Sequence, residues 1–277
     1  MKYITAIGGL SVGHWTEPVA LTGCTAIICE NGAVCGVDVR GSAPGTRETD
    51  LLRGYNSVTG INAVMLCGGS AFGLDAASGA MRYLEERGLG VDVGTGVVPI
   101  VPAAVIFDLG VGDSSIRPTK DDGYAACLDA KAGVYSTGRV GVGTGATVGK
   151  AFGPKFAMSS GIGSSCIDIG GGVKIGALVA VNALGDVYNP ETGCIVAGAR
   201  DGDGFLNCMS MTSKSAAPAG FTNTTIGVIA TNASLTREEA NKIASMGHDG
   251  LAMTIKPVHT HLDGDTLFAL STGEVQN

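Results

Sequence analysis

Near the C-terminal end of the chain, a small polar residue and two threonines open an apolar, β-branched stretch. The run reads Asn223-Thr224-Thr225-Ile226-Gly227-Val228-Ile229-Ala230-Thr231-Asn232-Ala233. Residues 225–231 form a short, almost continuous apolar segment, which is typical of a strand buried on both faces. Such a strand requires a sheet that is covered on both sides. It also holds the residues at its mouth, Asn223 and Thr224, in a rigid position where a site can form.

Thr224 is also a candidate catalytic nucleophile. A threonine hydroxyl is a poor nucleophile until a base takes its proton, and a free α-amino group on the same residue can be that base. The reference pKa of an α-amine is about 7.7–8.0, which is close to working pH. An enzyme that cuts its own backbone before Thr224 would create this amine. Taken alone, the run fits two other interpretations, a threonine at the edge of a buried strand and an Asn-x-Thr glycosylation sequon.

Four runs along the chain together indicate a family. They are Cys67–Ala77, Val98–Asp108, Gly141–Lys150 and Asn223–Ala233. In these residues and in this order, the chain resembles the L-aminopeptidase/D-esterase family of self-cleaving N-terminal-nucleophile hydrolases. That family includes the β-peptidyl aminopeptidases and the nylon-oligomer hydrolases. The resemblance implies a single domain, residues 1–277, that cleaves between Asn223 and Thr224 into an α chain (1–223) and a β chain (224–277).

The same resemblance assigns roles around Thr224. It implies that Lys150 lies beside the nucleophile, where a cation lowers the pKa of the amine or stabilises the oxyanion. It places Asn182, at the end of an apolar strand, as a second oxyanion donor, and it gives Asp263 and Asp265 the task of orienting the amine. Each residue also has a plainer interpretation. These are a solvated lysine, a turn asparagine and an Asp-Gly turn before the last strand.

Two segments are candidates for substrate binding. Gly68–Gly73 is predicted to be a tight strand-to-helix turn with Ser70 as the N-cap, and the free amides of Gly69 and Ser70 are expected to face a substrate carboxylate or oxyanion. In the stretch Pro102–Asp108, some relatives carry a Glu or Tyr near the substrate amine, but here the stretch is apolar and offers Phe107. We therefore expect Phe107 to contact the substrate, and an internal or hydrophobic amide to be favoured over a charged N-terminal amine.

The composition limits the classes of protein to which this chain can belong. Of 277 residues, 45% are hydrophobic and only 16% are charged, which provides a large core and little charged surface. Homo-oligomerisation, with a tetramer favoured, is one way to cover the apolar surface that the core does not bury. The net charge is -7 and no basic cluster occurs, so a nucleic-acid partner is not expected. No apolar run of 18 or more residues appears, so no membrane contact is expected.

The start of the chain and its cysteines indicate the compartment. Residues 1–5 soon meet Gly8 and Gly9 without the apolar core of a signal peptide, which predicts a cytoplasmic protein. The eight cysteines are scattered, mostly in apolar segments, and are interpreted as small buried hydrophobes in a reducing compartment. No Cys-x-x-Cys pair occurs, so a metal site is not expected, and the resemblance implies no organic cofactor.

The pattern of elements mixes helices with strands. It predicts an α+β or α/β fold, and the family resemblance implies a layered four-layer αββα sandwich like that of the ornithine acetyltransferases. Buried strands are expected at residues 173–182 and 225–231, and a final strand at residues 266–271. Thr25–Cys29 and Ala33–Val39 flank Glu30-Asn31-Gly32, which predicts a hairpin.

Three further segments are predicted from local signals. Residues 70–87 form a helix by apolar spacing, with Gly88 at its C′ position. Thr236 and Glu239 form a capping box that opens a second helix, which is expected to end at Gly247. Residues 198–221 lack periodicity and are interpreted as a loop.

The sequence thus predicts a self-processing aminopeptidase or amidohydrolase that forms an acyl-enzyme on Thr224 with a small peptide or amide substrate. Two alternatives remain open. One is an acyltransferase of the ornithine-acetyltransferase type, which passes the acyl group to an amine instead of water. The other is a non-catalytic relative in which Thr224 never matures.

Overall fold

The computed structural model describes residues 3–58, 60–210 and 222–275. Its centre is a nine-stranded sheet that β2 (Thr22–Val39) runs through from one half to the other. The first part of β2 pairs with β1 and β4, and its last part pairs with β18. One half of the sheet consists of β10 (Ile162–Gly170), β11 (Val173–Asn182), β16 (Thr224–Ala233), β18 (Thr266–Val275) and the end of β2. The other half consists of the start of β2, β1 (Leu10–Glu17), β4 (Gly60–Cys67), β7 (Ala103–Val105) and β3 (Thr46–Arg47).

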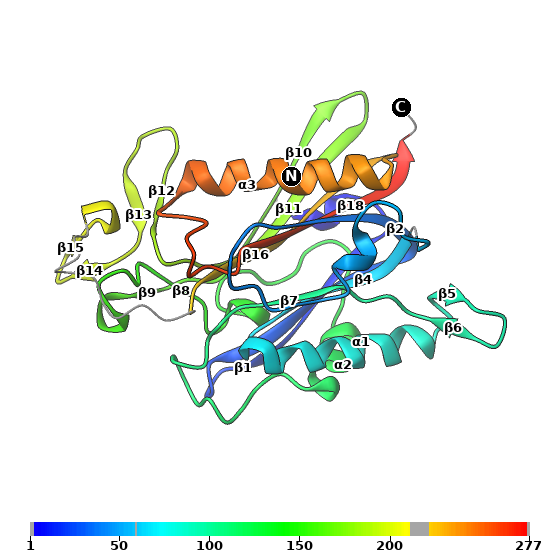
Figure 1. Cartoon of the computed structure of the whole chain (residues 1–277), viewed down its shortest axis with the longest axis horizontal. Coiled ribbons are helices and arrows are strands. Elements are labelled where there is room, and N and C mark those ends of the chain that lie inside the picture. Colours follow the sequence, from blue (N-terminus) through cyan, green and yellow to red (C-terminus); the bar gives the residue numbers. More distant parts are fainter. Residues whose placement is uncertain (1–2, 59, 211–221, 276–277) are drawn as a thin grey trace.

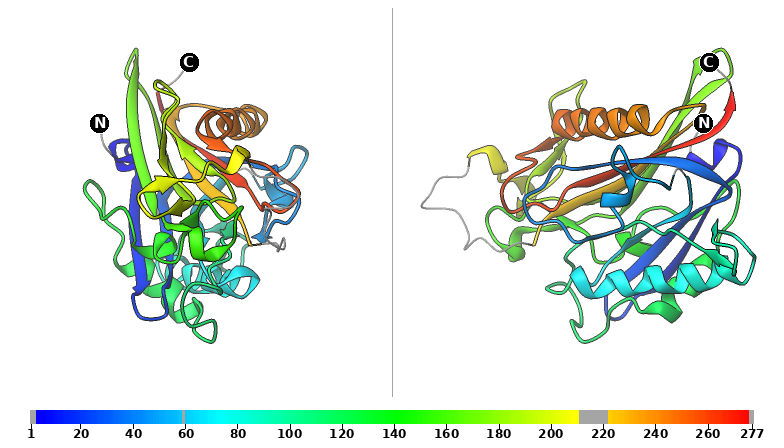
Figure 2. Two further views of the ribbon diagram at one scale, coloured as in Figure 1. Left: turned by 90° about the vertical axis from the view of Figure 1, so that its left-hand side faces the viewer. Right: turned by 45° about the vertical axis from the view of Figure 1, so that its right-hand side comes forward.

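Three hydrophobic cores define four layers. The inner faces of the two half-sheets share the largest core, which includes Ile27, Leu66, Leu178, Ile226 and Phe268. A second core joins the outer face of the β4 half to α1 (Ala76–Glu85) and α2 (Lys120–Leu128). A third core joins the outer face of the β16 half to α3 (Arg237–Thr254). Figures 1 and 2 show α3 on one side of the strands and α1 with α2 on the other. The predicted αββα layering is therefore confirmed.

The hairpin predicted at Glu30–Gly32 is wrong. Ile28 pairs with Ala63 on β4 and Ala33 pairs with Ile61, so residues 29–32 bulge out opposite Asn62 while the strand continues. The side-chain amide of Asn62 donates to the carbonyl oxygens of Cys29 and Glu30 at 3.3 and 3.4 Å. The Asn-Gly signal therefore marks a bulge, at which the strand passes from one half-sheet to the other.

The helix predicted over residues 70–87 begins differently from the prediction. Ser70–Asp75 forms a 3-10 turn (η3), and the α-helix starts at Ala76. Ser70 has φ 54° and its hydroxyl does not cap the helix, so its assignment as N-cap is wrong. The other end agrees with the prediction. Gly88 donates to the Glu85 carbonyl and Leu89 to the Leu84 carbonyl, which is the Schellman pattern of a C′ glycine.

The capping box at Thr236 is confirmed, but the helix it opens does not end at Gly247. α3 continues to Thr254. A Cβ added at Gly247 would lie 2.2 Å from Cδ1 of Ile229 and 3.0 Å from Cδ1 of Leu267. This glycine lies where the helix packs closely on the side chains of the sheet, and it does not end the helix.

Smaller elements complete the chain. They are β5 (Val91–Asp92), β6 (Val97–Val98), β8 (Thr147–Val148), β9 (Met158–Ser159), β12 (Asp186–Tyr188), β13 (Ile195–Ala197), β14 (Arg200–Asp201), β15 (Gly204–Phe205) and β17 (Ile255–Lys256), with short 3-10 turns at η1 (Ile4–Ala6), η2 (Asp50–Leu52), η4 (Gly141–Gly143), η5 (Pro154–Phe156) and η6 (Cys208–Ser210). The predicted loop over residues 198–221 thus contains the β14–β15 hairpin and a 3-10 turn. Its residues 211–221 lie outside the described part of the chain.

Seven of the eight cysteines are buried with free thiols, as expected for small core residues, and Cys194 is exposed. Among the helices that the structure describes, none has both the length and the apolar character that a membrane span requires.

Candidate active site

Three strand ends bring most of the predicted site residues together. Asn182 ends β11, Thr224 begins β16, and these two residues are paired across the antiparallel ladder. β18 starts at Thr266, and its parallel pairing with β16 places Asp265 beside Thr225. The strand predictions for 173–182, 225–231 and 266–271 are confirmed, and their common register assembles the site at one edge of the sheet.

The peptide bond between Asn223 and Thr224 is held at its carbonyl oxygen. The hydroxyl of Thr224 donates to the carbonyl oxygen of Asn223. The amide of Gly264 donates to the same oxygen at 2.9 Å, next to a parallel bridge between Asn223 and Asp263. Both residues of the bond are buried, at 3% and 5% exposure. A hydroxyl close to a carbonyl and a donor on the carbonyl oxygen are two of the features that nucleophilic attack on the carbonyl requires.

Asp265 braces the residue that follows Thr224. One of its carboxylate oxygens accepts the amide of Thr225 at 2.5 Å. The other lies 2.7 Å from Nδ1 of His259 and accepts the His259 amide at 3.2 Å. Asp265 is 1% exposed, so these contacts replace the water that an exposed carboxylate would bind.

Asp263 holds the loop before the last strand. Its Oδ2 accepts the amide and the hydroxyl of Thr260 at 2.7 and 2.6 Å. Burial raises the pKa of Asp263, and the charge of Asp265 raises it further. Among the contacts of the described residues, neither carboxylate bonds to Thr224 itself. Orientation of the Thr224 amine by these carboxylates stays a prediction for the cleaved chain.

Lys150 and Asn182 hold the segment before the bond. Lys150 follows β8, and its Nζ donates to the backbone and side-chain oxygens of Asn182 at 2.9 and 2.8 Å and to the carbonyl of Thr222 at 3.0 Å. The amide of Asn182 donates to Thr222 at 3.3 Å and to the carbonyl of Phe107 at 3.1 Å. These contacts are with Thr222 and not with the oxygen of Asn223. In the uncleaved chain that oxygen is held by Gly264, and the oxyanion roles of Lys150 and Asn182 stay predictions.

Two opposing effects, burial and nearby negative charge, act on the protonation of Lys150. Burial of the ammonium lowers the pKa of Lys150 to about 7, while the charges of Asp263 and Asp265 favour the protonated form. Its three oxygen acceptors match the three N–H groups of an ammonium. Lys150 therefore titrates in the range where the site would work.

A cavity of about 510 Å³ opens beside Lys150. It is lined by Phe107, Gly110, Val111, Thr147, Lys150, Gly153, Pro154, Ala157, Ser159 and Thr222. Lys150 is the one charged side chain among these lining residues, and its Nζ is already bonded to the protein. Phe107 thus lines a cavity whose other side chains, apart from Lys150, are neutral, and its contact with substrate stays a prediction.

Gly69 and Ser70 do not line this cavity. The amide of Gly69 donates to a carboxylate oxygen of Asp108 at 2.6 Å, and the amide of Ser70 donates to the carbonyl of Ile106 at 3.0 Å. The expectation that these amides are free is therefore wrong, because the turn uses them internally. Thr22 also donates to Asp108, which makes this buried carboxylate the anchor of the turn.

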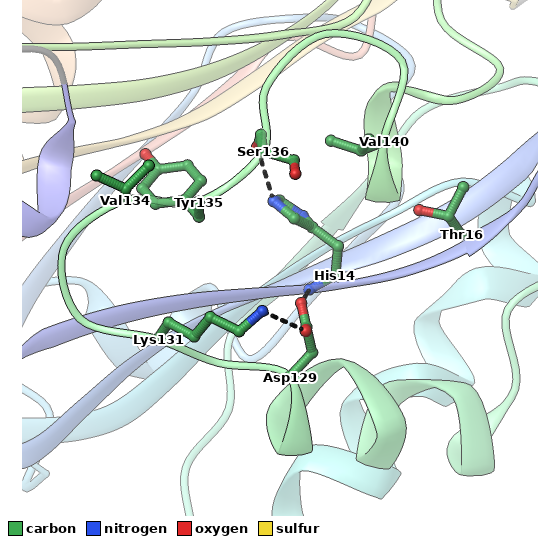
Figure 3. Close-up of a pocket in the computed structure, with 8 residues that line it drawn as sticks. All are labelled: His14, Thr16, Asp129, Lys131, Val134, Tyr135, Ser136 and Val140. Carbon is green, nitrogen blue, oxygen red and sulfur yellow. Dashed lines mark hydrogen bonds and ion pairs between the residues drawn. The ribbon is translucent and has the colours of Figure 1, made fainter.

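A second cavity, of about 430 Å³, lies between β1 and the segment that follows α2 (Figure 3). His14 points into it, Asp129 accepts the His14 amide, and Lys131 pairs with Asp129 at 3.0 Å. None of the residues that line it belongs to the predicted site. In the described part of the chain, no three His, Cys, Asp or Glu side chains gather in a way that could hold a metal ion.

Sequence reasoning missed four contributors to the site. In the sequence, Gly264 belongs only to an Asp-Gly turn, and no pattern points to Thr222, His259 or Thr260. The order Asp-Gly-Asp carries a weak signal for Gly264, because a glycine between two buried carboxylates indicates a close backbone approach. No local pattern marks His259 or Thr260, whose contacts depend on how residues 257–265 fold.

The chain as a whole matches the family model of peptidase family S58 over residues 2–277. An uncharacterized aminopeptidase of Mycobacterium bovis is 46% identical over 293 residues, which cover 99% of this chain and 83% of the relative. A 6-aminohexanoate-oligomer endohydrolase of a Kocuria species is 33% identical over 276 residues, which cover 96% of this chain and 74% of the relative.

Two solved structures share the fold. A β-aminopeptidase of a Burkholderia species superposes with a TM-score of 0.72 at 20% identity, covering 98% of this chain and 73% of the other. The L-aminopeptidase D-Ala-esterase/amidase of Ochrobactrum anthropi, described as a variant of the Ntn hydrolase fold, gives a TM-score of 0.72 at 21% identity and covers 98% and 74%. At these identities the likeness establishes the fold alone.

The shifted pKa of Lys150 predicts a pH dependence of stability. Its folded pKa is about 7 and its ordinary value is 10.5, so between these values the unfolded chain binds more protons and stability rises with pH. From pH 7 to pH 9, the free energy of unfolding should rise by about 2 kcal/mol more in the parent than in Lys150→Met. Urea unfolding in a Thr224→Ala background measures this on one continuous chain.

The matched control is Lys242→Met, which removes an exposed lysine on α3 and should leave the pH slope unchanged. Equal slopes in the parent and in Lys150→Met would show that Lys150 keeps its ordinary pKa in the fold.

Proposed function

The chain belongs to peptidase family S58, as its four sequence runs indicate, and on this premise we propose that it is a self-activating N-terminal-threonine hydrolase. Members of this family hydrolyse peptide or amide bonds, and the chain has the fold of the N-terminal-nucleophile hydrolases. The proposal adds that the chain cleaves itself between Asn223 and Thr224. It then forms an acyl-enzyme on the new terminal threonine.

The observation that carries the proposal is the pair of hydrogen bonds on one oxygen. The hydroxyl of Thr224 and the amide of Gly264 both donate to the carbonyl oxygen of Asn223. Attack by Oγ on the Asn223 carbonyl carbon forms a C–O bond and an oxyanion, which the Gly264 amide would stabilise. The C–N bond then breaks, and the hydroxyl proton ends on the nitrogen of Thr224. Breaking the C–N bond frees the α-amine and leaves an ester on Oγ, and water then hydrolyses this ester, which releases the carboxyl group of Asn223 and regenerates the hydroxyl.

The cleaved chain would then act on substrates by the same chemistry. The α-amine of Thr224 takes the hydroxyl proton as general base and later returns it to the leaving amine. Asp265 lies beside the following amide, Lys150 lines the cavity in which a small peptide or amide would bind, and Asn182 accepts a hydrogen bond from Lys150. In this proposal Lys150 and Asn182 stabilise the oxyanion, and Asp263 and Asp265 orient the amine.

The sheet supports the proposal that the two chains stay together. β16 lies between β11, which belongs to residues 1–223, and β18, which in turn pairs with β2. Strand pairing therefore crosses the division on both sides of the residue 224–277 segment. The seven buried free thiols also support the proposed reducing, cytoplasmic location.

Replacement of Thr224 by Ala should abolish self-cleavage, because no other hydroxyl bonds to the Asn223 carbonyl among the described contacts. The precursor has 277 residues and a mass of 27.7 kDa, or about 0.1 kDa a residue, so the parent should give chains of about 22 and about 5 kDa. The variant should remain at 27.7 kDa. Intact-mass spectrometry distinguishes the two results.

The adjacent threonine gives the control. Thr225 is fully buried, and its hydroxyl has no hydrogen-bond partner in the described structure, so Thr225→Val should fold and cleave like the parent. If Thr225→Val stops processing while Thr224→Ala does not, the nucleophile has been misassigned.

Addition of one methyl group at Gly264 should slow self-cleavage about tenfold or more, because small displacements of reacting groups are costly. A Cβ there would lie 2.9 Å from Oγ of Thr224 and 2.7 Å from the carbonyl oxygen of Ala43. Gly163→Ala is the matched control, since nothing lies within 4 Å of its added Cβ. The rates are read from gels of freshly synthesised precursor. Unchanged cleavage in Gly264→Ala would contradict the proposed contact of this loop with the nucleophile.

A further inference from the structure

A histidine outside the predicted site contacts one of its carboxylates. His259 lies in the loop between α3 and β18, and its Nδ1 is 2.7 Å from Oδ2 of Asp265. Its own backbone amide donates to the same oxygen at 3.2 Å. Its side chain is 15% exposed and that of Asp265 is 2% exposed. The loop therefore closes on this carboxylate from the side away from Thr225.

Both ring nitrogens of His259 face acceptors. Nδ1 faces the Asp265 carboxylate, and Nε2 lies 3.4 Å from the carbonyl oxygen of His248 on α3. A neutral imidazole can donate from only one nitrogen, whereas an imidazolium donates from both. The geometry thus suits the charged form, which pairs with the buried negative charge of Asp265.

The carboxylate of Asp265 connects His259 to the segment that contains Thr224. Its second oxygen accepts the amide of Thr225 at 2.5 Å, and Thr225 directly follows Thr224. Without the imidazole, Oδ2 of the buried carboxylate would keep only the His259 backbone amide at 3.2 Å and would lose its closer partner at 2.7 Å. His259 therefore acts on the nucleophile through Asp265 and touches no reacting atom.

We propose that His259 is a positioning residue whose imidazolium locks Asp265 onto the Thr225 amide and so fixes the Thr224 hydroxyl for self-cleavage. This inference rests on the proposed function. It adds a residue that the predicted site does not contain and a requirement for charge on that residue.

The surroundings of His259 set the direction of its pH dependence. Burial opposes its charge, but the hydrogen bond and charge of Asp265 outweigh burial and raise the pKa of His259. His248 packs edge-on against it at 4.8 Å between ring centroids, and the positive charge of Arg40 opposes protonation. His248 in turn contacts the carbonyl of Asp38. As pH rises through the raised pKa, the imidazolium is lost, and self-cleavage should slow.

The backbone conformation at His259 is compatible with replacement by asparagine. Its φ is 53°, a left-handed conformation that asparagine tolerates better than most residues. The side-chain amide of asparagine can also donate to Asp265 from near the position of Nδ1. His259→Asn therefore keeps the backbone and a neutral donor and removes the charge.

The test measures self-cleavage rate against pH for freshly refolded precursor, followed by intact mass. The parent and His261→Asn, which alters an exposed histidine of the same loop, should both slow on the alkaline side. His259→Asn should cleave about tenfold more slowly at neutral pH and lose the part of the alkaline decline that His259 contributes, while Lys150 keeps its own titration near pH 7. An unaltered pH profile in His259→Asn would overturn the inference. If the parent itself does not cleave, the proposed function fails instead.

A spectroscopic measurement covers the case in which His259→Asn does not fold. In uncleaved Thr224→Ala precursor, ¹⁵N NMR of the imidazoles should show His259 titrating above the ordinary histidine value of 6.5, and Asp265→Asn should lower its midpoint. If His259 is a single neutral tautomer at pH 6.5, the positioning role is wrong.

Discussion

The hydrogen bond from the Gly264 amide to the carbonyl oxygen of Asn223 continues the parallel pairing of β16 with β18 by one more step. Because it joins two backbone groups, its position is set by the register of the sheet and not by a flexible side chain. The other contacts of the site hold the residues on either side of this carbonyl, Thr222 and Thr225. The Thr224 hydroxyl bonds to it, and the absence of a side chain at Gly264 leaves room for that hydroxyl.

Buried charges surround this backbone contact, and each has partners that offset its desolvation. Asp265 has His259 and the Thr225 amide, Asp263 has Thr260, and Lys150 has three oxygens. A buried charge with one partner removed costs several kcal/mol, so such groups act as a set. The segments on both sides of the Asn223–Thr224 bond are therefore held by groups whose own positions are fixed.

Much of this arrangement could be predicted from the sequence, because strand period and family motifs report on β11, β16 and β18 directly. Local sequence signals gave wrong predictions where tertiary contacts determine the backbone structure. The Asn-Gly pair at residues 31–32 forms a bulge since β2 spans two half-sheets, and Gly247 allows close helix packing inside α3. The contacts of His259 and of the Gly264 amide could not be predicted, because they arise from the fold of the loop over residues 257–265. The proposed tetramer stays a prediction.

The account depends on Thr224 being the nucleophile. Trapping of an acyl group on this residue tests this most directly. The purified protein is treated with p-nitrophenyl acetate, quenched in acid and mapped by peptide mass spectrometry. The account predicts one acetyl group on Thr224, in a peptide that begins at this residue. An acetyl group on another side chain, or on an unbroken peptide that spans residues 223 and 224, would contradict it.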